Sequence, residues 1–528
     1  MKNKLVIIIG ILITFAYLVI NLLIINDFGL TWDFHYHHYA GLYHLGLPVP
    51  KIFDKAPVPF TPPDPRLTTE DPFGPFTQII PTLSHVFLYQ KWHLLPQDTA
   101  YNLPMVFFGS LGVGVIYFFL FQMFGLYEAM IGSLFLALLP NYIGYLHNDM
   151  KDIANAFAFT LAIYLFWRLV KSKKLTDLFL AVSAFAFAFN VKINSVMIPV
   201  VCLIWIILIY LKRFIVKRFS LSYIILYFIL SPLAAILLWW PFWRNPLAKL
   251  LELPYFYSHN TLNMPVLFMG RIFHSGVNTP WFYPIVYLAI TTPPIIFLSF
   301  LVGLMISVFY VINFYHKSNE MNKTNYYLLL LIWFFVPLFR YLSPKAGAID
   351  GVRHFMEAVY PMSAIGAIGW VAMIRWLRNR LAKTAIVILH VIVIIGLIKN
   401  IVIFHPYQTS YFSPLIGGIS GAQGKFDIDF WGTPQKEAMI WLNKNAPQNS
   451  FVNVVMAQSS AAVYARSDLL NNLNTKDIWT SDYVVLLNKQ SFFNLYPVSE
   501  YLNLRIKEKK NVYTKKIDSV PLVWVFKN

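Results

Sequence analysis

Two short segments carry charged side chains beside long apolar stretches, where charge is costly and a functional role is the first expectation. The segment 147-HNDMKDI-153 places Asp149, Lys151 and Asp152 at the end of an apolar run. The segment 31-TWDFHYHHYAG-41 places Asp33 shortly after the first apolar run. Carboxylate and ammonium groups supply acid–base and charge-binding chemistry. Together the two segments predict an active site on one face of a membrane.

Each of these sites also has a purely structural interpretation. Asp33 could cap a helix or lie in a solvated loop, because Asp is common at helix N-termini. Asp149 and Asp152, three residues apart, would share one helix face and could stabilise the start of the next span. Lys151 fits such a capping role poorly, because a cation is unfavourable at a helix N-terminus. The functional interpretation is therefore favoured, and a capped helix start is the alternative.

The composition requires a membrane environment for most of the chain. Of the 528 residues, 58% are hydrophobic and only 12% are charged, and the mean hydropathy is +0.57. These values predict an α-helical polytopic membrane protein. Apolar runs of ~20 residues, the length that crosses a bilayer, number about eleven. They lie roughly at 5–25, 102–123, 127–146, 153–170, 175–191, 194–212, 221–241, 283–313, 325–341, 355–374 and 384–403.

The distribution of Lys and Arg predicts the orientation of these spans. With the N-terminus in the cytoplasm, the inner connections carry more basic residues than the outer ones, as the positive-inside rule requires. An odd number of spans then puts the C-terminus outside. Because the basic residues are scattered among the spans, no nucleic-acid partner is expected. The candidate groups all fall on the outer side: Asp33, the 149–152 cluster, Lys192, Arg244, Arg271 with His274, and 350-DGVRH-354.

The chain divides into a transmembrane domain over 1–403 and a C-terminal domain over 404–528. Its two largest outer loops, 26–100 and 242–282, are rich in Pro, Trp, Phe and Tyr. Such loops are typical of helices that lie on the bilayer surface, and 76–92 and 246–258 are predicted to be juxtamembrane helices.

The C-terminal domain is predicted to be a small α/β module on the outer face. Helices are expected over 434–446 and 459–466. Buried strands are expected over 451–457 and 483–488, and a hairpin over 511–517 and 521–527. The glycine-rich 417-GGISGAQG-424 lacks the known phosphate-loop patterns, so it is interpreted as a tight connection that could pack over the active site.

Several features of the chain together resemble a known family of membrane enzymes. The acidic residue after the first span, the Lys-Asp cluster in the second outer loop and the soluble C-terminal domain resemble the GT-C glycosyltransferases. The segments 147-HNDMKDI-153, 350-DGVRHF-355 and 405-HPYQTSYFSPLIGGISGAQGKFDIDFWG-432 resemble motifs of bacterial family 39 members. These are similar to protein O-mannosyltransferases and lipid A aminoarabinose transferases. The first-loop motif reads Trp32-Asp33-Phe34, where many relatives have Asp-Glu.

The resemblance implies a hexosyl- or pentosyltransferase of the plasma membrane. It would move a sugar from a polyprenyl-phosphate donor to a lipid, glycan or protein acceptor on the non-cytoplasmic face. Asp33 is the candidate general base. The candidates for binding the donor phosphate or the acceptor are Asp149, Lys151, Asp152, Arg244, Arg271, Arg353 and His354.

Several alternatives stay open at this stage. A divalent metal ion is possible, with Asp33, Asp149 and Asp152 as candidate ligands, and His37 and His38 form a weaker pattern. Arg353 could be paired with Asp350, three residues before it. A polymerase or ligase of lipid-linked polysaccharide would use the same side and donor type. A lipid or sugar transporter is disfavoured, because its essential charges are expected near mid-span rather than at helix ends.

Overall fold

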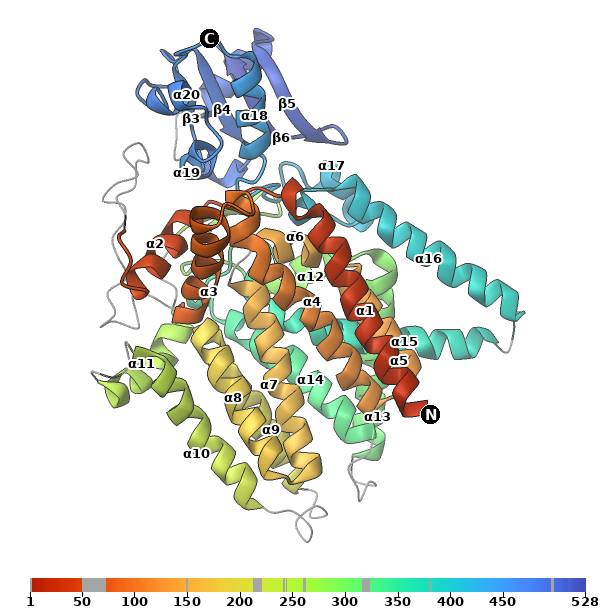
Figure 1. Cartoon of the computed structure of the whole chain (residues 1–528). Coiled ribbons are helices and arrows are strands. Elements are labelled where there is room, and N and C mark those ends of the chain that lie inside the picture. The colour runs from red at the N-terminus through yellow and green to blue at the C-terminus, as the bar shows by residue number, and fades with distance from the viewer. Residues whose placement is uncertain are drawn as a thin grey trace.

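The computed structural model describes residues 2–49, 73–148, 151–211, 221–240, 243, 245–259, 263–315, 323–378, 380, 382–494 and 498–528. Two of the candidate residues, Asp149 and Arg244, lie outside these ranges. In the described part of the chain, a helical bundle carries a small mixed domain at one end (Figure 1).

Each predicted span contains helical structure, which confirms the polytopic helical class. Seven described helices are long and apolar enough to cross a membrane, a bent pair gives an eighth candidate, and three apolar helices are shorter. The seven are α1 (Lys2–Ile24), α4 (Gln97–Met123), α7 (Asp152–Ser172), α13 (Pro294–Phe314), α14 (Lys323–Phe339), α15 (Val359–Arg378) and α16 (Lys383–Ile403). The pair is α5 (Leu126–Ala137) with α6 (Pro140–Asn148), and the shorter helices are α8 (Leu175–Val191), α9 (Met197–Leu211) and α10 (Leu221–Leu238).

Proline breaks two of the predicted spans. The run 283–313 is divided into α12 (Tyr283–Ile290) and α13, and Pro293 and Pro294 follow the break. The run 127–146 bends by 61° between α5 and α6, where Pro140 begins α6. Proline has no backbone N–H, and it disfavours helical geometry at the preceding residue, so a helix tends to end before it and a new one to begin at it.

Small residues let the central helices approach closely. A Cβ atom on Gly303 of α13 would lie 1.8 Å from the Ile365 carbonyl oxygen, and one on Gly369 of α15 would lie 1.9 Å from the Ser299 carbonyl oxygen. Only glycine allows this contact, as in other small-residue interfaces between membrane helices. By contrast, α1 and α16 lie at the edge of the bundle (Figure 1). Only 17% and 6% of the residues in their most apolar stretches are buried.

Helices are present in both segments that were predicted to lie at the membrane surface. The predicted outer loop 26–100 contains α2 (Phe34–His44), α3 (Pro75–His85) and a π-helical turn over Val86–Lys91, and the other large loop, 242–282, contains α11 (Pro246–Ser258). The 242–282 loop also holds an unpredicted hairpin of β1 (Pro265–Phe268) and β2 (Arg271–His274). Its turn residues, Met269 and Gly270, both have positive φ. Such a two-residue turn usually carries Asn-Gly or Asp-Gly, so Met-Gly gives a weak sequence signal.

The C-terminal domain is the predicted α/β module. Its sheet has the order β3-β4-β6-β5, with β3 parallel to β4 and the other pairs antiparallel. The predicted hairpin is confirmed as β5 (Asn511–Ile517) and β6 (Val520–Lys527), and the predicted helix 434–446 as α18 (Gln435–Asn445). The remaining elements are β3 (Val452–Val454), β4 (Tyr483–Leu487), α17 (Gly418–Ala422), α19 (Gln458–Ala462), α20 (Ser467–Asn471) and α21 (Val498–Lys507). Thus β3 and α19 are shorter than predicted.

Polar contacts attach this domain to the bundle. Lys436 of α18 donates to Asp98 Oδ2 of α4 at 2.7 Å and to the Asn26 carbonyl at 2.6 Å. Tyr464 donates to the same carboxylate at 3.1 Å and accepts from the Leu30 backbone N–H at 2.8 Å. The domain therefore sits over the end of the bundle where the first outer loop lies (Figure 1).

Candidate functional site

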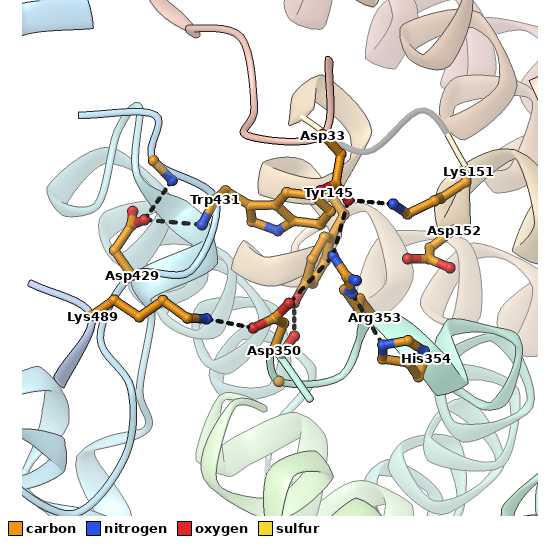
Figure 2. A network of polar contacts seen from close by, with 12 residues as sticks. Asp33, Tyr145, Lys151, Asp152, Asp350, Arg353, His354, Asp429, Trp431 and Lys489 are labelled. Atoms are coloured by element: carbon orange, nitrogen blue, oxygen red, sulfur yellow. Dashed lines mark hydrogen bonds and ion pairs between the residues drawn. The ribbon is translucent and has the colours of Figure 1, made fainter. Parts of the chain in front are cut away.

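Asp33 lies between two cations, Lys151 and Arg353 (Figure 2). Its carboxylate forms an ion pair with Lys151, and Arg353 Nη1 lies 3.6 Å from Asp33 Oδ2. The Lys151 and Arg353 side chains are only 4% and 9% exposed, whereas that of Asp33 is 35% exposed. The carboxylate is therefore the open group of the three, and the cations lie beneath it.

The electrostatic setting of Asp33 keeps it ionised. Burial would raise the pKa of this carboxyl, but the positive charges of Lys151 and Arg353 outweigh burial and hold the pKa well below its ordinary value. Asp33 occupies the N-cap position of α2, yet its side chain makes no capping hydrogen bond. The structural interpretation of Asp33 as a helix cap is therefore wrong.

Lys151 is positioned by the connection between α6 and α7, where it is the N-cap residue of α7. Its ammonium group also lies 3.2 Å from His37 Nε2 of α2. Burial and the Lys151 charge hold the pKa of His37 well below its ordinary value, so its ring is neutral and Nε2 accepts this hydrogen bond. The Lys151 ammonium also faces the Phe73 ring at 4.9 Å. Lys151 is thus directed toward α2 and Phe73 rather than toward solvent.

Asp350 connects Arg353 to the C-terminal domain (Figure 2). Asp350 Oδ2 lies 3.4 Å from Arg353 Nη1, so the predicted local ion pair is present. Asp350 Oδ1 lies 2.8 Å from Lys489 Nζ, which follows β4. The segment turns sharply here, with positive φ at Asp350 and Gly351. A Cβ atom on Gly351 would lie 3.2 Å from the hydroxyl of Tyr145, which donates to the Asp350 carbonyl.

The ring of Trp431 packs against both cations of the Asp33 site. Its centroid lies 4.6 Å from the Arg353 guanidinium carbon and 5.6 Å from Lys151 Nζ. The Asp429 carboxylate holds this segment by accepting from the backbone N–H groups of Trp431 and Gly432 at 3.0 and 2.8 Å. Burial raises the pKa of Asp429 to about 6. Cation–π contact of this kind stabilises desolvated cations without neutralising them.

The ion-pair partner of Asp152 is Lys192, whereas that of Lys151 is Asp33. Lys192 follows α8, and the side chains of Asp152 and Lys192 are almost completely buried. One role predicted for Asp152 was to hold Lys151 in place. The ion pair with Lys192 does not serve that role. The pair instead joins the start of α7 to the end of α8, beneath the Asp33 site.

Removing one partner of this pair is expected to destabilise the protein. Lys192→Met should lower the free energy of unfolding by about 3 kcal/mol, because the Asp152 charge would stay buried without its cation. The double variant Asp152→Asn, Lys192→Met should recover most of that loss. Thermal unfolding of the purified protein in detergent measures both, and equal stability of the single variant and the wild type would contradict the prediction.

A metal site was one of the predicted alternatives. Among the described residues, no group of three His, Cys, Asp or Glu side chains is arranged to hold a metal ion. Asp33 and Asp152 each face a lysine. Of the two histidines considered, His37 Nε2 accepts from Lys151 and His38 Nδ1 lies 3.2 Å from Thr82 Oγ1.

The other sequence candidates occupy varied positions. His354 Nε2 accepts from Arg353 Nε at 3.2 Å and so supports that guanidinium group. Arg271 lies on the exposed part of β2, and no contact found in the described residues joins it to Asp33. Asp149 and Arg244 fall outside the described ranges. The roles of all these residues stay predictions.

Sequence reasoning missed Lys489 and Trp431 as members of the site. Lys489 lies in a polar domain where lysine is common, so nothing in its local sequence marks it. Trp431 lies in the 405–432 segment that carries the family resemblance, but it is one of 15 tryptophans in the chain. A buried Lys and a buried Trp become informative only when the domain is docked on the bundle.

Comparison with known proteins gives a family match and a fold. The family described as dolichyl-phosphate-mannose-protein mannosyltransferase matches residues 95–240. The crystal structure of ArnT from Cupriavidus metallidurans bound to undecaprenyl phosphate superposes with a TM-score of 0.50 at 10% identity, covering 98% of this chain and 97% of that one. The Archaeoglobus fulgidus oligosaccharyltransferase in its apo form gives a TM-score of 0.49 at 11% identity, covering 90% and 70%. No curated protein sequence matches.

The helical bundle with juxtamembrane helices and a docked α/β domain is the GT-C architecture of polytopic membrane transferases. The chain therefore shares the fold of ArnT, and its residues 95–240 are similar to the mannosyltransferase family. Both findings agree with the resemblance to the GT-C glycosyltransferases that the sequence shows.

Proposed function

We propose that this protein transfers a sugar from a polyprenyl-phosphate donor to a lipid, glycan or protein acceptor on the non-cytoplasmic face of the plasma membrane. The observation that carries the proposal is the partly exposed Asp33 carboxylate between the buried cations Lys151 and Arg353. A base beside two cations suits a reaction in which a hydroxyl loses a proton while a phosphate departs.

In the proposed reaction, an acceptor hydroxyl or amine attacks the anomeric carbon of the donor sugar. The new bond from the acceptor oxygen or nitrogen to that carbon forms as the bond from carbon to the phosphate oxygen breaks. The electron pair of the broken bond stays on the polyprenyl phosphate, where Lys151 and Arg353 stabilise the added negative charge. The acceptor proton goes to Asp33.

The ion pairs of the site suggest how the base becomes effective. While Lys151 and Arg353 contact Asp33, its depressed pKa makes it a weak base. A bound donor phosphate would compete for the same two cations and weaken their hold on the carboxylate. Asp33 would then regain basicity only when the donor is present, which limits unproductive proton transfer.

The donor class is supported by the relative that shares this fold. ArnT from Cupriavidus metallidurans is described in complex with undecaprenyl phosphate, the lipid phosphate that such a transfer would release. The matched family is described by a dolichyl-phosphate-linked mannose donor. Both lipids present a single phosphate at the end of a polyprenyl chain, the group that a Lys–Arg pair recognises.

The direct test uses the full chain purified in detergent. Incubation with polyprenyl-phosphate sugars and candidate acceptors should release polyprenyl phosphate, and undecaprenyl phosphate alone should raise the thermal stability of the protein. A chain that neither binds undecaprenyl phosphate nor releases polyprenyl phosphate would contradict the proposal. The length of the glycan product separates a single transfer from polymerisation.

The proposed topology makes a separate prediction. A reporter fused after Asn400, near the end of α16, should be active only on the non-cytoplasmic side, because positive-inside asymmetry favours that placement. A matched fusion after Lys174, between α7 and α8, should report the cytoplasm. A cytoplasmic signal after Asn400 would overturn the placement of Asp33 and of the C-terminal domain.

A further inference from the structure

Lys489 belongs to the C-terminal domain, but its ammonium group ends in the transferase site (Figure 2). The side chain is 5% exposed, and Nζ lies 2.8 Å from Asp350 Oδ1. Its backbone position is fixed by the sheet, because Asn488 donates from its backbone N–H to the Leu522 carbonyl at 2.9 Å and from its side chain to the Pro521 carbonyl at 2.7 Å. Lys489 is therefore held toward Asp350 by the domain itself.

A second link keeps this part of the domain in place. The Asp427 carboxylate accepts from the backbone N–H of Ser491 at 2.9 Å and from that of Leu267 in β1 at 3.1 Å. The segment before the domain, the β1–β2 hairpin and the residues after Lys489 thus meet at one carboxylate. The Lys489 ammonium also lies 4.6 Å from the centroid of the Phe492 ring.

Asp350 is shared between two cations from different parts of the chain. One oxygen faces Lys489 and the other faces Arg353 Nη1, which itself lies 3.6 Å from Asp33. Without Lys489, the full charge of Asp350 would act on Arg353 alone. That attraction would compete with an incoming phosphate for the guanidinium group.

The charges of this network bear on the binding of the proposed donor. Lys151, Arg353 and Lys489 form ion pairs with the carboxylates Asp33 and Asp350, and the Asp427 and Asp429 carboxylates also act on Lys489. A polyprenyl-phosphate sugar is a phosphodiester with one negative charge. If Lys489 is removed, a site that must bind this anion loses one positive charge.

We infer that Lys489 is a positioning residue of the transferase site, supplied by the C-terminal domain to neutralise Asp350 and leave Arg353 available for the donor phosphate. The inference rests on the proposed function. It assigns the domain a part in donor binding, so that the site is complete only when the domain is docked. Lys489 itself acts through Asp350 and Arg353 and does not need to contact the donor.

The test measures the Kd of undecaprenyl phosphate, and KM and kcat for the donor, with the full-length protein in detergent. Lys489→Met should raise Kd and KM about tenfold, the size of coupling expected within one ion-pair network, with a smaller change in kcat. Lys489→Arg should stay near the wild type. The double variant Asp350→Asn, Lys489→Met should recover most of the affinity, because no excess carboxylate would then hold Arg353.

The matched control is Lys436→Met, which removes a second, partly buried Lys–Asp contact between the domain and the bundle. It should lower thermal stability without raising Kd. A Lys489→Met protein that binds like the wild type overturns the inference alone, as does a double variant that binds no better than Lys489→Met. A wild type that neither binds undecaprenyl phosphate nor turns over donor overturns the proposed function together with it.

Discussion

Asp33→Asn is expected to lower kcat for sugar transfer by about 10³-fold, the contribution typical of a general base. The amide has nearly the same shape as the carboxylate but cannot accept the acceptor proton. Donor binding should not weaken, and the affinity for undecaprenyl phosphate should rise, because Lys151 and Arg353 would lose the carboxylate that now faces them. Turnover and lipid binding, measured on the same purified protein, check both parts.

The control for this variant is Asp27→Asn, six residues earlier in the chain. Asp27 is 55% exposed and is paired with His405 rather than with the cations of the site. Its replacement should leave kcat near that of the wild type. Retained turnover in Asp33→Asn would rule out Asp33 as the base, whereas loss of both turnover and lipid binding would show that the variant had damaged the site as a whole.

Replacement of either cation should, unlike Asp33→Asn, weaken lipid binding as well as lower the rate. Lys151→Met and Arg353→Ala should each weaken undecaprenyl phosphate binding and lower the transfer rate by about 10²–10³-fold, because a preorganised partner of the departing phosphate is lost. Arg353→Lys should be intermediate, because lysine keeps the charge but loses the planar fork of donors. Titration with undecaprenyl phosphate and single-turnover release of the lipid are the measurements.

Lys171→Met provides the matched control for Lys151→Met. Lys171 lies at the other end of α7, where its ammonium packs 4.8 Å from the Trp167 ring centroid. This change removes a lysine from the same helix but from the opposite end, so lipid binding should not change. If Lys151→Met and Arg353→Ala both keep wild-type affinity and rate, the assignment of the phosphate site is wrong.

Much of the architecture followed from local chemistry. Apolar runs of membrane length predicted helices because a backbone in lipid must satisfy its hydrogen bonds internally. The hairpin β5–β6 and helix α18 were likewise indicated by period and turn residues. The β1–β2 hairpin was missed because a Met-Gly turn carries little signal. The parallel pairing of β3 with β4 was not predicted, because strand order depends on packing between segments far apart in the chain.

Part of the candidate site could likewise be predicted from the sequence, and part needed the tertiary structure. Asp33 and Lys151 could be found from the sequence, because charge at the end of an apolar run is costly wherever the run packs. The sequence could not choose between Lys151 and Lys192 as partners for the acidic groups. Packing of α7 against α8 brought Asp152 to Lys192 and left Lys151 for Asp33.

The sequence by itself thus predicted a polytopic helical membrane protein with acidic and basic groups at one end of its spans, and its motifs carried the resemblance to the GT-C glycosyltransferases. Only the tertiary structure decided which charges meet. Asp33, Lys151, Asp350, Arg353 and Lys489 come from four distant segments, and the partner of each depends on helix packing and on the docking of the C-terminal domain. Costs of burial are local properties of a residue, whereas ion pairs depend on distance in space, which local sequence does not encode.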